Sequence, residues 1–285
     1  MIALSRSVHK RSATARAGGF TLVELAMVLL IVGLLLGGLM YTLAAQSTQR
    51  SREESVRRLE QARELLVSFA MVRGRLPCPA RCSNFPFCDL AGDGGDEANV
   101  GGIGTACTDN YPGYLPGRAI GFQPVDAGGY ALDSYGNRIR YAVSATQWGT
   151  TPFARFTKQH IANDATAAWN VTQTPADLLV CASSTAAGFN AATPACGANN
   201  AVTNTNLVVA VVWSQGKNYS SMPVGNVDEQ VNNKHRLPVA LNNNAAFVWH
   251  DLRPAGATGG EYDDLVLWLP VSQLYGRLAS AGVLP

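Results

Sequence analysis

The sequence predicts an α+β fold in which a long amino-terminal helix packs on a largely antiparallel sheet. Two observations favour this class. Proline is missing between Phe20 and Leu76, and five short apolar or β-branched segments, each bounded by turn residues, occupy the second half of the chain. A third observation is that all six cysteines follow the predicted helix. We therefore expect long loops that are stapled by disulfides.

The predicted helix has two halves of different character. Residues 20–43 are apolar except for one acid and are long enough to span a membrane. Residues 44–74 are amphipathic, with Leu59 and Leu66 among the apolar positions. We expect the first half to be a transmembrane segment and the second half to pack its apolar stripe on the sheet, with the helix ending near Val72.

Glu24 is the acid inside the apolar half. A carboxylate in hydrocarbon costs roughly 2.5–3.5 kcal/mol on insertion scales, so intramembrane acids usually mark a function. The preceding residues 1–19 contain no acid, and such a basic flank stays in the cytoplasm. The basic residues of this leader are Arg6, Lys10, Arg11 and Arg16.

The order of these features is informative: a basic leader, then Gly19, then Phe20-Thr-Leu-Val-Glu24 and a long apolar run. It resembles the class III signal of type IV pilins and type II secretion pseudopilins. The resemblance implies that prepilin peptidase removes residues 1–19 by cutting between Gly19 and Phe20, and that the new amino terminus on Phe20 is methylated. Glu24 would then meet the α-amino group of a neighbouring subunit during assembly. The alternative, an ordinary signal peptide or signal anchor, would place a cleavage site after the apolar core.

The same resemblance implies a location and partners. Residues 20–43 would hold the protein in the inner membrane as a single-pass segment, with residues 75–285 as a periplasmic head. The protein would then enter a pilus or pseudopilus, which can reach the cell surface. Its partners would be prepilin peptidase, other pilin or pseudopilin subunits and the inner-membrane assembly platform.

The size of the head and Tyr41 bear on the kind of subunit. Tyr41 stands where many pilus-forming relatives have a proline, and residues 75–285 form a head that would crowd a repeating filament. Both favour a minor pilin or a pseudopilin over a major pilin. The alternative function is a binding module at the filament tip, for adhesion or DNA uptake.

The six cysteines lie on the side of the membrane where oxidation is expected. Cys181 and Cys196 bracket a segment rich in small polar residues and are predicted to form one bridge. The other four leave three pairings open: Cys78, Cys82, Cys88 and Cys107. Zinc is disfavoured because no histidine lies near them.

Calcium is the one cofactor that the sequence suggests. Segments 213–228 and 259–268 resemble the glycine-rich loop and the Asp-containing segment that bind calcium in major pseudopilins, which makes Asp263 and Asp264 the lead metal ligands. The acidic glycine-rich run of residues 89–97 is a second candidate, although its spacing does not fit an EF-hand. The alternative for Asp263 and Asp264 is that they cap a strand or accept backbone hydrogen bonds, and the alternative for residues 89–97 is an ordinary solvated loop.

Enzymatic and nucleic-acid-binding functions are disfavoured. The four histidines are dispersed, and neither a nucleophile elbow nor a HExxH helix is present, since Ser214 lacks the required preceding glycine. Removing the leader turns the formal charge of +2 into a small net negative charge, which does not suit nucleic acid. A few basic residues could still touch phosphate, and five tryptophans could supply contacts but are more often core residues. These residues are Lys217, Lys234, Arg236, Trp148, Trp169, Trp213, Trp249 and Trp268.

The head is expected to begin with a turn into its first strand. Residues 133–141 resemble the turn that leads into the first strand of major pseudopilin heads, with Ser134 in place of a proline. The predicted strands are residues 138–144, 178–182, 207–213, 247–252 and 265–269. Residues 271–281 are predicted to form a short closing helix.

Overall fold

The structure of the protein is a computed structural model. It describes residues 19, 21–83, 93–100, 106–145, 156–157, 176–220, 226–234 and 244–283. Within these ranges the side chains of residues 38–45, 100, 106 and 220 are not described. The chain divides into two compact units, Met1–Gln49 and Arg50–Pro285.

Helix α1 runs from Leu22 to Arg73, close to the end expected near Val72. Thr21 caps its start, because the Thr21 hydroxyl accepts a 3.3 Å hydrogen bond from the Glu24 backbone N–H. Gly74 ends it in the left-handed conformation, φ +67°, with its N–H bonded to the Ala70 carbonyl at 2.8 Å. Among the residues whose side chains are described, no helix has the length and apolar character that crossing a membrane requires.

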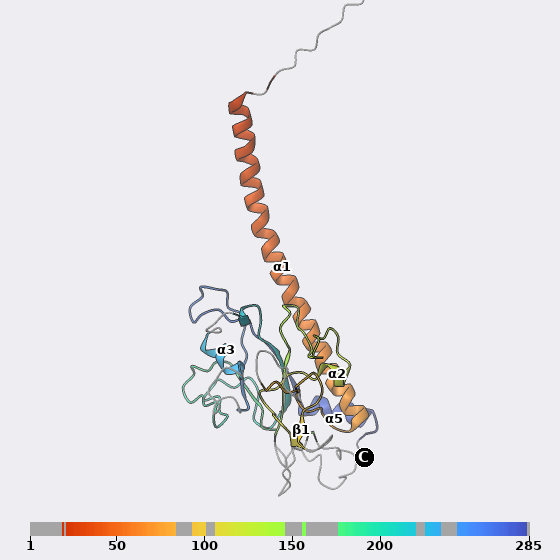
Figure 1. The fold of residues 1–285 in the computed structure, drawn as a ribbon. Coiled ribbons are helices and arrows are strands. Elements are labelled where there is room, and N and C mark those ends of the chain that lie inside the picture. The colour runs from red at the N-terminus through yellow and green to blue at the C-terminus, as the bar shows by residue number, and fades with distance from the viewer. Residues whose placement is uncertain are drawn as a thin grey trace, which may run out of the picture. The chain divides into compact units, whose positions relative to one another are not determined.

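The second unit is an α+β head whose core includes the last part of α1. From Leu59 onward, the buried positions 59, 62, 66 and 70 of α1 recur at intervals of three and four residues, with Val67 beside them, which places them along one face of the helix. This face packs in one cluster with strand residues such as Tyr141 and Val212. Helix α5, Val271–Ser280, buries Leu274 and Leu278 in the same cluster. Figure 1 shows α5 beside the carboxyl-terminal end of α1.

Three strands form the antiparallel sheet against which this face packs. They are β3 (Arg140–Val143), β5 (Val208–Ser214) and β7 (Leu265–Pro270), in the order β3-β5-β7. All residues of β5 are buried, as expected for the central strand. Its side chains divide between the cluster with α1 and a second cluster that contains Trp213 and Phe247.

The expectation that all five predicted strands belong to a largely antiparallel arrangement is wrong in one respect. Strands β4 (Leu179–Cys181) and β6 (Ala246–Val248) form a separate parallel pair. Strand β6 also ends earlier than expected, at Val248. The side chain of Asn232 forms hydrogen bonds of 2.9 Å with both the N–H and the C=O of Val248. These backbone groups are therefore not available to pair with another strand.

The remaining elements are short. They are β1 (Asn99–Val100), β2 (Ala106–Cys107), α2 (Gly117–Ile120), the 3₁₀ turn η1 (Asn218–Ser220) and α3 (Val227–Asn232).

Two disulfides are described in the head. Cys181 is joined to Cys196, the pair that the sequence predicts, and Cys78 is joined to Cys107, one of the pairings left open. In each bridge the two Cα atoms are 5.3 Å apart. Cys82 is also disulfide-bonded, and Cys88 lies outside the described residues.

Candidate functional site

The amino-terminal segment carries the residues that the resemblance to pilins singles out. Gly19 is exposed, whereas Phe20 and residues 1–18 lie outside the described residues. Glu24 is exposed in the first turn of α1, where a negative charge is favourable to the helix dipole. The apolar side chains that follow are also exposed, for example 85% at Leu22 and 71% at Leu34. Within the first unit, the described part of α1 therefore presents apolar side chains with one carboxylate at its start.

A second candidate site is a cluster of three carboxylates in the head: Glu229, Asp263 and Asp264. One ligand atom from each lies within 4.8 Å of the others. Asp263 and Asp264 immediately precede strand β7, and Glu229 lies in helix α3. The structure thus brings together the two acids that the sequence predicts as metal ligands and adds a third.

Local structure positions Glu229. Asn226 caps α3 by accepting hydrogen bonds from the N–H groups of Asp228 and Glu229, at 2.8 and 3.1 Å. Its side-chain amide also donates to the Glu261 carbonyl at 2.5 Å, which ties the helix start to the segment before β7. The Glu229 carboxylate in turn accepts the Asp263 N–H at 2.6 Å and the Asn218 side-chain amide at 3.0 Å.

Close approach of Gly216 positions Asp263. The Asp263 carboxylate accepts the N–H groups of Lys217 and Asn218, at 2.7 and 3.1 Å. Gly216 has a φ of +66°, and a Cβ there would lie 2.1 Å from Asp263 Oδ1. Only glycine allows the loop after β5 to turn this closely around the carboxylate.

The three carboxylates are crowded, and two of them, Glu229 and Asp264, are buried while Asp263 is partly exposed. Burial, followed by the charge of Asp263, raises the pKa of Glu229 to about 7. Burial raises the pKa of Asp263, and burial with the nearby charge of Glu229 raises that of Asp264 well above its usual range. Carboxylates this close resist simultaneous ionisation unless a cation or shared protons compensate them.

The donor set fits a hard divalent cation such as calcium. Asp263 Oδ1 and Asn218 Oδ1 are buried and find no hydrogen-bond partner among the residues that the structure describes. Both belong to side chains that already contact the cluster, and calcium prefers carboxylate and amide oxygens. Glu229, Asp263, Asp264 and the Asn218 side chain are therefore the residues that would hold such an ion.

The sequence did not point to Glu229, because this residue lies outside the loop that follows Gly216 and just beyond the segment 213–228. The available signal was Asn226 followed by Asp228 and Glu229, a pattern typical of a helix start. The other acidic candidate, the run 89–97, does not form a carboxylate cluster within the described residues. There Asp93 accepts from Ser83, Asp96 pairs with Arg118 and Glu97 pairs with Arg75.

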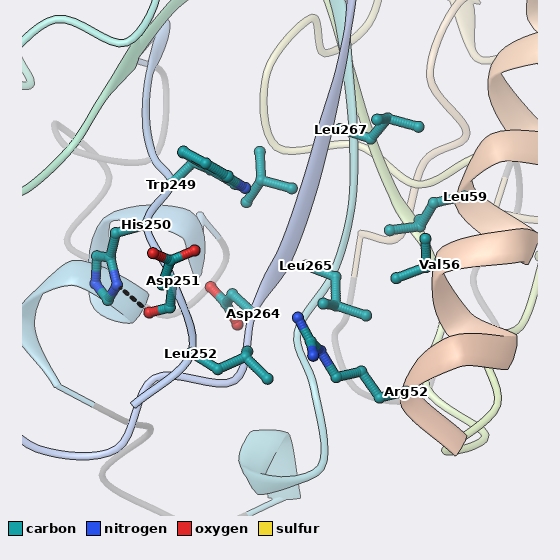
Figure 2. A pocket seen from close by; sticks show the side chains of 11 residues that line it. Arg52, Val56, Leu59, Trp249, His250, Asp251, Leu252, Asp264, Leu265 and Leu267 are labelled. Carbon is teal, nitrogen blue, oxygen red and sulfur yellow. Dashed lines mark hydrogen bonds between the residues drawn. The ribbon is translucent and has the colours of Figure 1, made fainter. Parts of the chain in front are cut away.

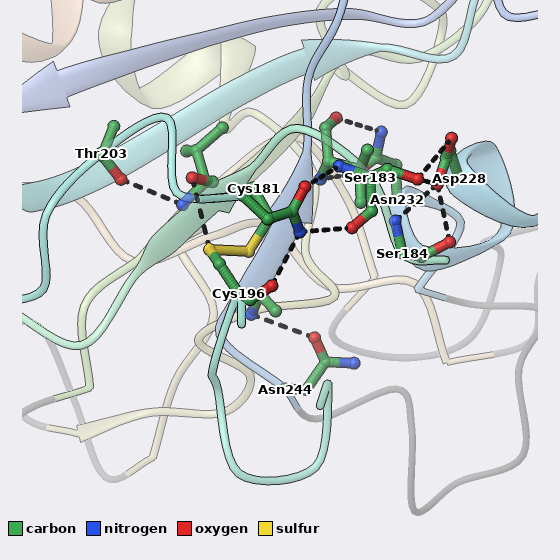
Figure 3. The surroundings of a disulfide bond; sticks show 12 residues. Cys181, Ser183, Ser184, Cys196, Thr203, Asp228, Asn232 and Asn244 are labelled. Atoms are coloured by element: carbon green, nitrogen blue, oxygen red, sulfur yellow. Dashed lines mark hydrogen bonds between the residues drawn. A yellow bond between two sulfur atoms is a disulfide. The ribbon is translucent and has the colours of Figure 1, made fainter. Parts of the chain in front are cut away.

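Asp228, the neighbour of Glu229, joins α3 to the loop closed by the second disulfide. Its carboxylate accepts the Ser184 N–H at 2.6 Å and the Ser184 hydroxyl at 2.7 Å. The Arg253 guanidinium donates to it at 3.1 Å, and His250 Nε2 lies 3.3 Å away. Figure 3 shows Asp228 facing Ser183 and Ser184, close to the Cys181–Cys196 bridge. The short helix α3 therefore contacts the carboxylate cluster through Glu229 and the disulfide loop through Asp228.

A cavity of about 190 Å³ opens between α1 and β7. Its lining combines apolar side chains with charged ones, among them Arg52, whose Nε is buried and has no hydrogen-bond partner in the described part of the chain. Figure 2 shows Asp264 between Trp249, above it, and Leu252, below it, with Leu265 and Arg52 to its right. Trp249 is 37% exposed, so this cavity is bordered by a solvent-accessible aromatic ring.

The remaining candidates are placed as follows. Trp213 and Lys234 are fully buried, so neither is available to an external phosphate or base, while Lys217 is exposed. The Ser214 hydroxyl donates to Asp133 at 2.5 Å inside the head. Trp268 packs edge-on against Trp249, with ring centroids 5.9 Å apart. The positions outside the described residues are His9, Trp148, His160, Trp169, His235 and Arg236.

Comparison with known proteins gives no match: no protein-family model, curated protein or solved structure matches this chain.

Proposed function

We propose that this protein is a non-enzymatic structural subunit of a filament of the type IV pilin and type II secretion pseudopilin class, either a minor pilin or a pseudopilin. The observation that carries the proposal is Glu24, a lone carboxylate in the first turn of a long helix whose described neighbours expose apolar side chains. It follows a Gly19-Phe20 junction and a purely basic leader. An acid in this position is costly in a membrane unless an opposite charge meets it.

In the proposed assembly, prepilin peptidase cleaves after Gly19 and the amino group of Phe20 becomes the new terminus. The segment 20–43 holds the subunit in the inner membrane until it enters the filament. There the Glu24 carboxylate pairs with the α-amino group of Phe20 of a neighbouring subunit. Since an unpaired buried charge costs far more than a paired one, this contact would select one register between adjacent helices.

The head is placed in the periplasm by the same proposal. Its disulfides agree with an oxidising compartment. The amphipathic half of α1 already packs its apolar face within the head, so the segment before Arg50 is the part left for contacts with membrane and other subunits. The partners are prepilin peptidase, the other filament subunits and the inner-membrane assembly platform.

Mass spectrometry of the amino terminus and a charge-removing variant test the proposal together. We expect the mature chain to begin with a methylated Phe20. Glu24→Gln should be cleaved normally but be missing from sheared filaments, whereas Glu60→Gln, which alters an exposed acid of the head portion of α1, should assemble. A chain that begins at Met1 or after the apolar run, or normal assembly of Glu24→Gln, would contradict the proposal.

Recognition at the filament tip is the second candidate function. The cavity lined by Arg52 and Trp249 favours it, because an unpartnered buried guanidinium nitrogen and an exposed aromatic ring suit a polar ligand with an apolar part. If the ligand is DNA, as in DNA uptake, the purified protein should retain DNA at low salt and release it at high salt. Retention that falls with salt and is weakened in Arg52→Ala would support this function, and no retention at low salt would remove its DNA-uptake form.

A further inference from the structure

Lys234 is a cation enclosed in the head. It lies two residues after helix α3 ends at Asn232, and its exposed fraction is 0%. Its Nζ lies within hydrogen-bond distance of three oxygens: Asn244 Oδ1 at 2.7 Å, the Asn244 carbonyl at 3.2 Å and the Ala246 carbonyl. It also lies 4.1 Å from the centre of the Phe247 ring. The amine is thus held against the side-chain amide of Asn244, which is itself 2% exposed.

The surroundings of Lys234 favour its uncharged form. Among the described residues, no ion pair involves Lys234. Burial, and then the positive charge of Arg140, lowers the pKa of Lys234 well below its usual range. Arg140 is itself fully buried against the rings of Tyr114 and Trp213, and within the described residues its guanidinium nitrogens have no hydrogen-bond partner. A lysine that is desolvated beside another cation is an activated nucleophile.

Hydrogen bonds to the side-chain oxygen of Asn244 make its Cγ atom more electrophilic. Asn244 Oδ1 accepts a 3.1 Å hydrogen bond from the Ala246 backbone N–H in addition to the one from Lys234. A backbone N–H aimed at this oxygen would stabilise the negative charge that develops there when the carbonyl carbon is attacked. Because a C=O bond is about 1.2 Å long, Lys234 Nζ lies within about 4 Å of Asn244 Cγ. Enclosure by the core keeps the two groups together.

We propose that Lys234 and Asn244 join in an intramolecular isopeptide bond. The lone pair of Lys234 Nζ forms a bond to Asn244 Cγ, and the carbonyl π electrons move onto Oδ1. The tetrahedral intermediate then collapses, the Cγ–Nδ2 bond breaks, and one proton from Nζ leaves with Nδ2 as ammonia. The products are one secondary amide and one ammonia molecule, so no oxidant, metal or co-reactant is needed. Each chain reacts once, so the reaction needs no fast turnover.

The bond would act as a covalent staple that does not depend on the proposed filament function. It would fasten the end of α3 to the residues that lead into β6, across the segment 235–243. The two described disulfides close other loops, Cys78–Cys107 and Cys181–Cys196. Unlike them, an isopeptide bond survives reducing conditions.

Intact-mass measurement of the reduced, full-length protein tests the proposal. We expect wild-type protein to be about 17 Da lighter than its sequence mass, the loss of one ammonia. Lys234→Met and Asn244→Ala should each have the full mass, while Lys217→Met, which alters an exposed lysine, should keep the deficit. Wild-type protein at its full sequence mass overturns the proposal, and this result does not depend on whether any variant folds.

Tryptic digestion separates this cross-link from other losses of ammonia. Trypsin cuts after Arg236, between Lys234 and Asn244, so the linked residues would be recovered as one branched species under reducing conditions. Cyclisation of an asparagine to a succinimide gives the same mass loss but releases two separate peptides. Recovery of separate peptides, with cleavage after Lys234, would also overturn the proposal.

Discussion

The backbone N–H of Asp263 donates a 2.6 Å hydrogen bond to the carboxylate of Glu229, while the Asp263 side chain lies in the same cluster of acids. This contact joins helix α3 to the start of strand β7. It also holds two carboxylates close together in a place where water is largely excluded, because Glu229 is buried. The arrangement makes the charge of this cluster the most testable feature of the head.

Calcium is expected to bind at this cluster and to stabilise the head. An ion that binds only the folded state adds about 2.7 kcal/mol when its free concentration is about 100 times Kd. The melting temperature of the purified protein should therefore rise with calcium and fall again with a chelator. Asp263→Asn should remove this response, whereas Glu60→Gln should keep it. Equilibrium dialysis without calcium binding, together with an unchanged melting temperature, would rule the ion out.

Without metal, stability should depend on pH in a direction set by Glu229. Its folded pKa of about 7 lies above its ordinary value, so the folded state binds the proton more tightly than the unfolded state. The stabilisation is complete below about pH 4.5 and is lost as pH rises through 7, an effect of at most roughly 3 kcal/mol at 1.36 kcal/mol per pKa unit. The raised pKa values of Asp263 and Asp264 also make the folded state less stable as pH rises. The lowered pKa of Asp228 has the opposite effect on stability.

Urea unfolding in a chelator measures this effect. We expect the free energy of unfolding to fall between pH 5.5 and pH 8 for wild-type protein and to fall less for Glu229→Gln, which cannot ionise. An unfolding free energy that rises equally in both proteins over this range would show that Glu229 does not titrate as described.

Gly216→Ala should disturb the cluster far more than an ordinary glycine substitution. The new Cβ would lie 2.1 Å from Asp263 Oδ1, and the left-handed backbone adds about 1–2 kcal/mol of strain. Gly136→Ala is the matched control, because its φ is also positive, +82°, but nothing lies within 4 Å of the added carbon. We expect Gly216→Ala to lose both stability and calcium response, and Gly136→Ala to lose only about 1–2 kcal/mol of stability. Equal losses measured by urea unfolding would show that the close approach to Asp263 is unimportant.

The buried ion pair between Arg75 and Glu97 should contribute strongly to stability. Its two hydrogen bonds measure 2.5 and 2.8 Å, and Glu97 also accepts the Cys78 N–H at 2.8 Å. Glu97→Gln leaves a buried guanidinium without its counter-charge, which costs about 3–5 kcal/mol. Asp96→Asn breaks the exposed pair with Arg118 and should cost less than about 1 kcal/mol. Similar changes in the urea midpoint of both variants would contradict this ranking.

Local sequence signals predicted most of the elements and part of the carboxylate cluster. Helix α1 ends within one residue of the expected position because Gly74 and the prolines after it are local stop signals. Strands β3, β5 and β7 were found from their apolar and β-branched composition. Strand β6 is shorter than predicted: Trp249 and Leu252 are apolar, but the strand ends at Val248, whose backbone N–H and C=O bond the side chain of Asn232. A side chain that binds a strand's backbone in place of a neighbouring strand cannot be recognised from the alternation of apolar and polar residues in the sequence.

The sequence by itself determined the long helix, the lone acid at Glu24, the segments that become strands and the Cys181–Cys196 pair. These depend on neighbours in the chain, whose spacing and chemistry can be read directly. Only the tertiary structure decided that β4 and β6 pair in parallel, that Cys78 joins Cys107, and that Glu229 meets Asp263 and Asp264. It also decided that Lys234 is buried against Asn244. Each of these contacts joins segments separated in the chain, so it depends on how the helix and the sheet pack.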